Sequence, residues 1–131
     1  MSRSRALSAS LLALAAGLGA CGSGDVFRTQ RPILRITLDE YRIVPQNIEV
    51  APGRVKFVVR NGGRLTHNLV IQNEGPDGKW IELPGRRLAT MQPGQTAVPI
   101  KVAFAPGTYR LVCTIANHDD LGQFGTLEVR R

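Results

Sequence analysis

Hydrophobic and polar residues alternate along much of the chain beyond residue 32. The clearest stretch is 54–60, where Val55, Phe57 and Val59 alternate with residues suited to a solvent-facing position. A period of two is typical of a β-strand with one buried face, so we expect these three side chains to face a core. Further strand-like stretches occur at 33–38, 41–44, 47–50, 67–71, 96–104, 108–113 and 124–129.

Glycine and proline separate these stretches. Pro52-Gly53 and Pro106-Gly107 are turn signals, and Pro99 favours an edge strand or a bulge within 96–104. The segment 80–95 is the least regular, and we expect a short strand or a helical turn there. Because the chain beyond residue 32 shows no long amphipathic helical pattern, seven or eight short strands predict an all-β fold, a Greek-key antiparallel β-sandwich.

The first twenty residues have a different character. Arg3 and Arg5 form a basic start, and 6–17 is a run of small and apolar residues. This pattern is typical of a signal peptide, and it is too short for a membrane-spanning helix. The sequence 18–21, Leu-Gly-Ala-Cys, resembles the lipobox of bacterial lipoproteins, which implies that Cys21 carries lipid after cleavage. The alternative is an ordinary signal peptide with an incidental cysteine.

These features predict three parts: a lipoprotein signal peptide at 1–20, a flexible tether at 21–32 and one folded domain at 33–131. We therefore expect an exported protein of the periplasm or cell envelope, anchored to the membrane through Cys21. The length after cleavage suits one domain, and we expect a monomer.

The whole chain has a net charge of +7. Loss of Arg3 and Arg5 with the signal peptide leaves 15 of the 17 basic residues against all 10 acidic ones, a net charge of about +5. The basic residues are scattered and aromatic residues are few, so we expect no binding to nucleic acid. Attraction to anionic lipid or to an acidic protein fits this charge better.

The chain has two cysteines and two histidines. If Cys21 carries lipid, Cys113 has no disulfide partner. Cys113 opens the loop 113–123, His118 follows five residues later, and His67 begins an upstream strand. A thiolate with two imidazoles suits copper, and Gln123, five residues after His118, is placed as a weak fourth ligand.

Two other chemistries compete with copper at this site. Zinc also accepts one cysteine and two histidines. A nucleophilic Cys113 paired with His118 lacks an orienting acid and a pocket signal in the sequence, so we expect no enzyme activity.

The sequence resembles the cupredoxins, the small blue copper proteins, from about residue 33 to 130. The segment 105–113, with Tyr109 four residues before the cysteine, is similar to the strand that leads to the copper ligand in that family. The pair His67-Asn68 and the closing segment 125–129 also match. The resemblance implies one type 1 copper ion bound by His67, Cys113 and His118. It also implies that Asn68 ties the histidine strand to the cysteine loop.

The chain departs from the family pattern in the second half of the loop. Most members have methionine at the position of Gln123, whereas stellacyanin-like members have glutamine there, as this chain does. We predict that an amide oxygen lowers the reduction potential relative to a Gln123→Met variant. Asp119-Asp120 follows His118, which implies either a redox partner with a basic docking surface or simply solvated charges. Asn117 stands where a two-copper centre needs a second cysteine.

The leading hypothesis is a membrane-anchored mononuclear blue copper protein that carries single electrons between redox partners outside the cytoplasm. One alternative is a protein that delivers copper to an extracytoplasmic acceptor, although the chain has no methionine-rich or histidine-rich tract. The other is a metal-free assembly module, in which Cys113 would be replaceable.

Overall fold

The structure is a computed structural model that describes residues 24–131; the predicted signal peptide and the predicted lipidation site at Cys21 lie outside these residues. It contains ten strands and no helix in this range. The strands are β1 (Val26–Thr29), β2 (Ile33–Asp39), β3 (Arg42–Val44), β4 (Asn47–Val50), β5 (Gly53–Asn61), β6 (His67–Glu74), β7 (Trp80–Met91), β8 (Ile100–Phe104), β9 (Gly107–Val112) and β10 (Phe124–Val129).

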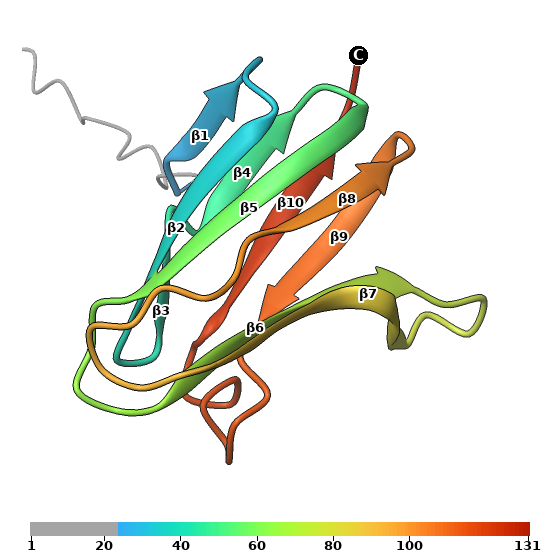
Figure 1. The fold of residues 1–131 in the computed structure, drawn as a ribbon. Coiled ribbons are helices and arrows are strands. Elements are labelled where there is room, and N and C mark those ends of the chain that lie inside the picture. The colour runs from blue at the N-terminus through green and yellow to red at the C-terminus, as the bar shows by residue number, and fades with distance from the viewer. Residues whose placement is uncertain (1–23) are drawn as a thin grey trace, which may run out of the picture.

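The strands form two sheets that face each other (Figure 1). One has the order β1-β4-β10-β9-β6-β7 and the other the order β3-β2-β5-β8. The predicted all-β sandwich is confirmed. Both sheets are mixed, however, because β1 and β10 pair with β4 in parallel and β2 pairs with β5 in parallel. The strand number also exceeds the predicted seven or eight.

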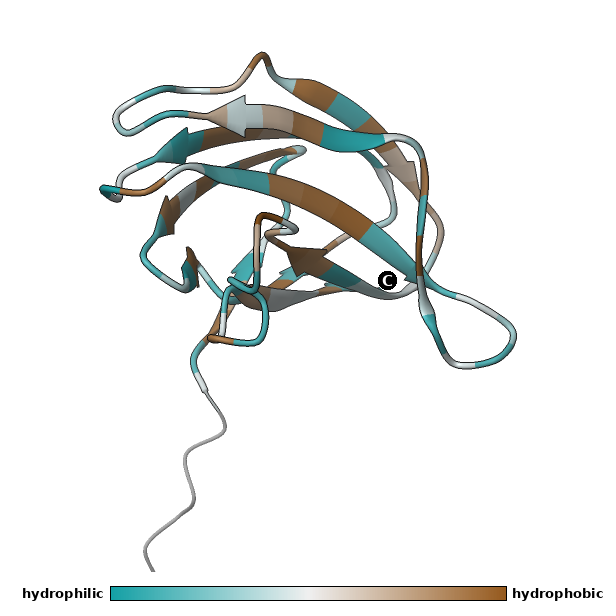
Figure 2. Cartoon of the chain, turned by 90° about the horizontal axis from the view of Figure 1, so that it is seen from below, coloured by the Kyte–Doolittle hydropathy of each residue, from teal (hydrophilic) through white to brown (hydrophobic). Residues whose placement is uncertain are grey.

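The core lies between the sheets and follows the alternation in the sequence (Figure 2). In β5, Val55, Phe57 and Val59 are at most 2% exposed, as predicted. In β2, Leu34, Ile36 and Leu38 are equally buried, and the residues between them are exposed. The sequence therefore predicts the inner face of the smaller sheet position by position.

Two segments differ from the prediction. Val26–Thr29 lies within the predicted tether, yet it forms β1 and pairs with β4. The segment 80–95 is mostly the long strand β7, which pairs with β6 through two register shifts. Because β7 is an edge strand, Pro84 needs no ladder partner on its outer side and is tolerated. Both segments are largely exposed, so neither shows a clear buried face in the sequence.

One end of the sandwich gathers the predicted site. The end of β2, the start of β6, the end of β9 and the start of β10 meet there, and the loop 113–123 closes over them (Figure 1). All ten strands and the core fall within residues 26–129, so residues 22–131 include every strand and the whole core that the structure describes. No helix in the described part of the chain is long and apolar enough to cross a bilayer.

Candidate metal centre

Three side chains that suit a transition metal converge at this end. His67 begins β6, Cys113 follows β9, and His118 comes from the loop between β9 and β10. Cys113 Sγ lies 3.9 Å from His67 Nδ1 and 3.6 Å from His118 Nδ1. One ligand atom from each residue lies within 4.8 Å of the other two. His67 and Cys113 are fully buried and His118 is 8% exposed.

The loop is held in shape by its own backbone. Cys113 N–H donates to Gln123 O at 3.1 Å, and Gln123 N–H donates to His118 O at 3.0 Å. Gly122 has a φ of 110°, which a residue with a side chain rarely adopts, so glycine is required there. These bonds place Gln123 beside the cysteine and histidine that precede it.

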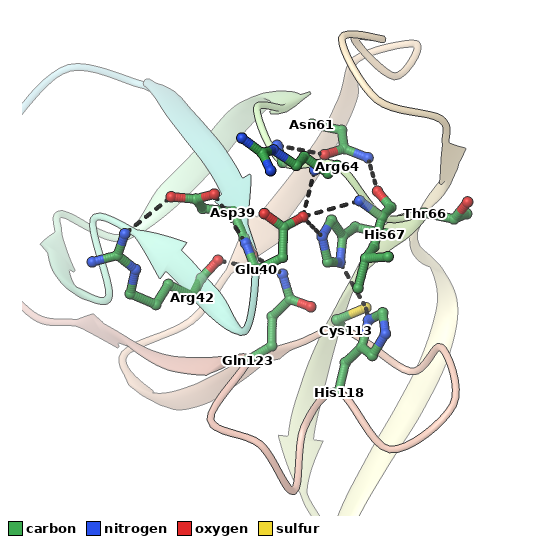
Figure 3. A network of polar contacts seen from close by, with 12 residues as sticks. Asp39, Glu40, Arg42, Asn61, Arg64, Thr66, His67, Cys113, His118 and Gln123 are labelled. Carbon is green, nitrogen blue, oxygen red and sulfur yellow. Dashed lines mark hydrogen bonds and ion pairs between the residues drawn. The ribbon is translucent and has the colours of Figure 1, made fainter.

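Gln123 is fully buried and only half of its amide is hydrogen-bonded. Its Nε2 donates to the backbone oxygens of Asp39, at 2.7 Å, and Arg42, at 3.3 Å. Its Oε1 is buried without a hydrogen-bond partner. Figure 3 shows this oxygen on the side that faces the cysteine and the histidines. A buried oxygen with no partner is unfavourable by itself, and a metal ion would satisfy it.

A carboxylate lies behind His67. Glu40 Oε1 is 3.6 Å from His67 Nε2, just beyond hydrogen-bond distance, and on the opposite side of the ring from Nδ1 (Figure 3). The N–H groups of Leu65, at 2.9 Å, and Arg64 donate to the same oxygen and hold the pKa of Glu40 below its usual value. The carboxylate is therefore charged at neutral pH and favours a proton on Nε2, which leaves Nδ1 free to bind a metal.

Two neighbouring glycines lie in tightly packed positions at and next to the Glu40 carboxylate. A Cβ on Gly63 would collide with the Glu40 carboxylate, and a Cβ on Gly62 would lie 2.8 Å from Thr37 Cγ2. Asn61 holds the same segment, because its Oδ1 accepts from Gly63 N and its Nδ2 donates to Leu65 O. The sequence Asn-Gly-Gly, which reads only as the end of a strand, thus shapes the cradle of this carboxylate.

Asn68 connects the histidine strand to the cysteine loop. Its Oδ1 accepts a hydrogen bond from Thr114 N at 2.8 Å, and its Nδ2 donates to Thr114 Oγ1 at 3.0 Å. Arg87 Nη1 donates to the same hydroxyl at 3.2 Å. Thr114 directly follows Cys113, so these contacts fix the cysteine relative to His67.

The exposed rim of the site contains aromatic, apolar and acidic groups. Tyr41, in the turn between β2 and β3, packs edge-on against His118 with ring centroids 5.4 Å apart. Leu121 is 51% exposed. Of the two loop carboxylates, Asp119 lies 3.8 Å from Arg110 and Asp120 is exposed with no ion-pair partner in residues 24–131.

The arrangement suits metal binding better than nucleophilic catalysis. Glu40, His67 and Cys113 form a line like that of a catalytic triad. However, the thiol and the imidazole are both fully buried, so a substrate cannot reach them. A thiol and two imidazoles with an unpaired amide oxygen match the donor set of a His₂Cys site with a weak axial ligand.

The structure thus brings together all four residues that the sequence singled out, and it adds Glu40 and Asn61. Met91 lies directly opposite His67 in the β6–β7 ladder. Its side chain is buried in the core cluster.

No protein-family model matches the sequence. Among characterised proteins, the chain is 28% identical over 120 residues to the copper-resistant cuproprotein CopI of Rubrivivax gelatinosus, covering 82% of this chain and 71% of that protein. Among solved structures, it resembles reduced auracyanin from Roseiflexus castenholzii (TM-score 0.61, 21% identity, 79% of this chain and 100% of that one). It also resembles auracyanin B, with a TM-score of 0.65 and 21% identity over 84% of this chain and 96% of that one. Rusticyanin from Thiobacillus ferrooxidans is similar as well, with a TM-score of 0.60 and 17% identity over 83% of this chain and 84% of that one. At these identities the structural likeness establishes the fold.

Proposed function

We propose that this protein, whose fold is that of the cupredoxins, is a mononuclear type 1 copper protein that carries single electrons and is not itself an enzyme. His67 Nδ1, Cys113 Sγ and His118 Nδ1 would be the equatorial ligands, and Gln123 Oε1 the weak axial ligand. Copper bound there would supply a centre that alternates between Cu(II) and Cu(I).

The observation that carries the proposal is the convergence of the Cys113 thiol with two Nδ1 atoms, with their ligand atoms within 4.8 Å of one another. The unpaired Oε1 of Gln123 also supports it, because a metal ion would satisfy this buried atom. Zinc would satisfy the same three donors, but the weak fourth donor is a feature of electron-transfer copper sites.

The surroundings suit electron transfer. The ligands come from strand ends and from a loop closed by backbone hydrogen bonds, so they are positioned without help from the metal. His118 is the one ligand candidate with measurable exposure among the three, and Leu121, three residues later in the same loop, is exposed. Electrons would therefore pass through the His118 edge.

The test is to add Cu(II) to residues 22–131 and record visible absorption and EPR spectra. We expect an intense thiolate-to-copper band at roughly 600 nm. Cys113→Ser should abolish the band, whereas Ser23→Ala, a change far from the site in sequence, should leave it intact. Colourless protein with only weak, nonspecific copper binding would refute the proposal. If the unsubstituted protein shows no such band with Cu(II) but binds zinc tightly, the site would be a zinc site.

The same proposal includes a location and partners. Export and a lipid anchor at Cys21 would place the domain at an extracytoplasmic membrane surface. The exposed Asp120 beside His118 would favour a redox protein with a basic docking surface. Substitution of Asp120 by Asn should then slow electron exchange with such a partner and reduce its dependence on salt.

Copper handling is the second candidate function, and the named relative favours it. That relative is described as a copper-resistant cuproprotein. A protein that delivers copper should release Cu(I) to a competing chelator within the time of an exchange assay. An electron carrier should instead retain copper through repeated oxidation and reduction. Stopped-flow measurement of copper loss to a Cu(I) chelator distinguishes the two.

A further inference from the structure

The outer face of the four-stranded sheet carries a concentration of positive charge, most of it near the starts of β2 and β5. Five of the side chains point outward from β2, β5 and β8, and the sixth lies two residues before β2. We call this set the basic face; it consists of Arg31, Arg35, Arg54, Lys56, Arg60 and Lys101. Within residues 24–131, none of the six lies within ion-pair distance of a carboxylate, whereas Arg28, Arg42 and Arg130 elsewhere on the surface do.

The arrangement of these charges is unfavourable for the isolated protein. Lys56 and Lys101 are directly opposite each other in the β5–β8 ladder, and Arg54 lies on the same side of β5. Like charges directly opposite each other on adjacent strands are destabilising. The one acidic residue on the outward side of β2 is Asp39, at its far end, and it is already paired with Arg42. No carboxylate on the outward side of β2 is therefore free to balance these charges.

Apolar side chains lie among the charges. Ile33 is 45% exposed and lines a groove of ≈ 320 Å³ together with Pro32, Arg54, Lys56 and Lys101. The same Ile33 lines a second groove with Phe27, which is 49% exposed, and with Arg31 and Arg35. Exposed apolar groups surrounded by Lys and Arg are typical of surfaces that rest in the interfacial region of a bilayer.

The orientation of this face is compatible with the proposed function. The grooves lie at the start of β2 and β5, whereas Asn61, at the end of β5, already contacts the segment next to His67. Figure 1 shows the loop 113–123 at the end of the sandwich opposite the start of these strands. A molecule resting on this face would leave the metal centre accessible from the aqueous side.

We propose that the basic face is a membrane-docking surface that binds an anionic lipid bilayer. The charge complementarity and the apolar side chains within it carry the inference. The surface does not depend on bound metal, so it can be tested in the metal-free protein.

The experiment measures binding of residues 22–131 to phosphatidylcholine vesicles with and without phosphatidylglycerol by sedimentation. We expect binding only to the anionic vesicles, weakening as sodium chloride is raised. Lys56→Gln with Lys101→Gln should weaken binding about 25-fold, because each basic residue at an anionic surface contributes about fivefold. The matched control, Arg64→Gln with Lys79→Gln, removes the same charge elsewhere and should change binding less than about threefold.

Further measurements separate the alternatives. The Lys56→Gln/Lys101→Gln protein should melt no lower than the unsubstituted protein, since the like-charge pair is removed. Equal weakening by both double variants would mean that only net charge matters, and it would overturn the proposal. Binding to polyglutamate without binding to anionic vesicles would also overturn it, in favour of an acidic protein partner.

Discussion

Replacement of Asn68 by Ala tests whether the cysteine loop is held in place without metal. The side chain makes two hydrogen bonds to Thr114, one to the backbone N–H at 2.8 Å and one to the hydroxyl at 3.0 Å. Asn68 is 4% exposed, and its replacement by Ala removes the whole side-chain amide. The variant therefore loses both of these partly buried hydrogen bonds to Thr114.

The size of the effect follows from these contacts. A hydrogen bond contributes about 0.5–1.5 kcal/mol net, so two bonds contribute about 1–3 kcal/mol. Thr114 itself is exposed, and water can replace part of what it loses. Arg87 also remains bonded to its hydroxyl. We therefore expect a decrease in the free energy of unfolding of about 1–2 kcal/mol, or about 4–8 °C in melting temperature for a domain of this size.

The assay is urea unfolding of the metal-free protein, followed by a thermal melt. Asn73→Ala is the matched control, because Asn73 lies on the same strand and its Oδ1 has no hydrogen-bond partner. We expect the control to change stability by less than about 0.5 kcal/mol. A loss in Asn68→Ala no larger than in Asn73→Ala would refute the idea that Asn68 secures the loop.

Three further substitutions test other contacts. Gly125→Ala should destabilise by about 1–3 kcal/mol in urea unfolding, because the new Cβ would overlap the carbonyl oxygen of Gln46 and lie 3.2 Å from its carbon. Tyr109→Phe should lower the melting temperature by about 4 °C through loss of the 2.8 Å hydrogen bond to Ala105 O; an unchanged melt would show that the bond contributes nothing. Gln123→Met should raise the reduction potential of the copper-loaded protein in a potentiometric titration, because a thioether favours Cu(I) more than an amide oxygen does. An equal or lower potential would contradict Gln123 as axial ligand.

The strands that the sequence predicts well are those with one fully buried face. β5 is the clearest, because Val55, Phe57 and Val59 face the core while their neighbours face outward. β1 and β7 are different, since most of their side chains are exposed on both faces and burial imposes no alternation on them. Their strand conformation comes from pairing with β4 and β6, which a local pattern does not contain.

The site shows the same division. The sequence can single out the four candidate ligands, His67, Cys113, His118 and Gln123. Histidine and cysteine are rare in this chain, and Gln123 follows His118 at the same five-residue spacing that separates His118 from Cys113. Glu40 cannot, because carboxylates are common on surfaces and its approach to His67 depends on the fold. The available signal was the consecutive pair of glycines after Asn61, which indicates a close backbone approach but not which group approaches.

The contacts that position the site use atoms other than those proposed to bind metal. Gln123 is held through Nε2, which leaves Oε1 directed into the site. Glu40 approaches His67 from the Nε2 side, which leaves Nδ1 beside the thiol. Asn68 restrains the loop through Thr114 and contacts none of the ligand atoms. Because Gln123 and His67 are contacted through atoms other than the proposed donors, a metal that enters or changes oxidation state need not disturb these contacts. Low rearrangement is what rapid electron transfer requires, and here it follows from how the hydrogen-bonding groups are divided between support and coordination.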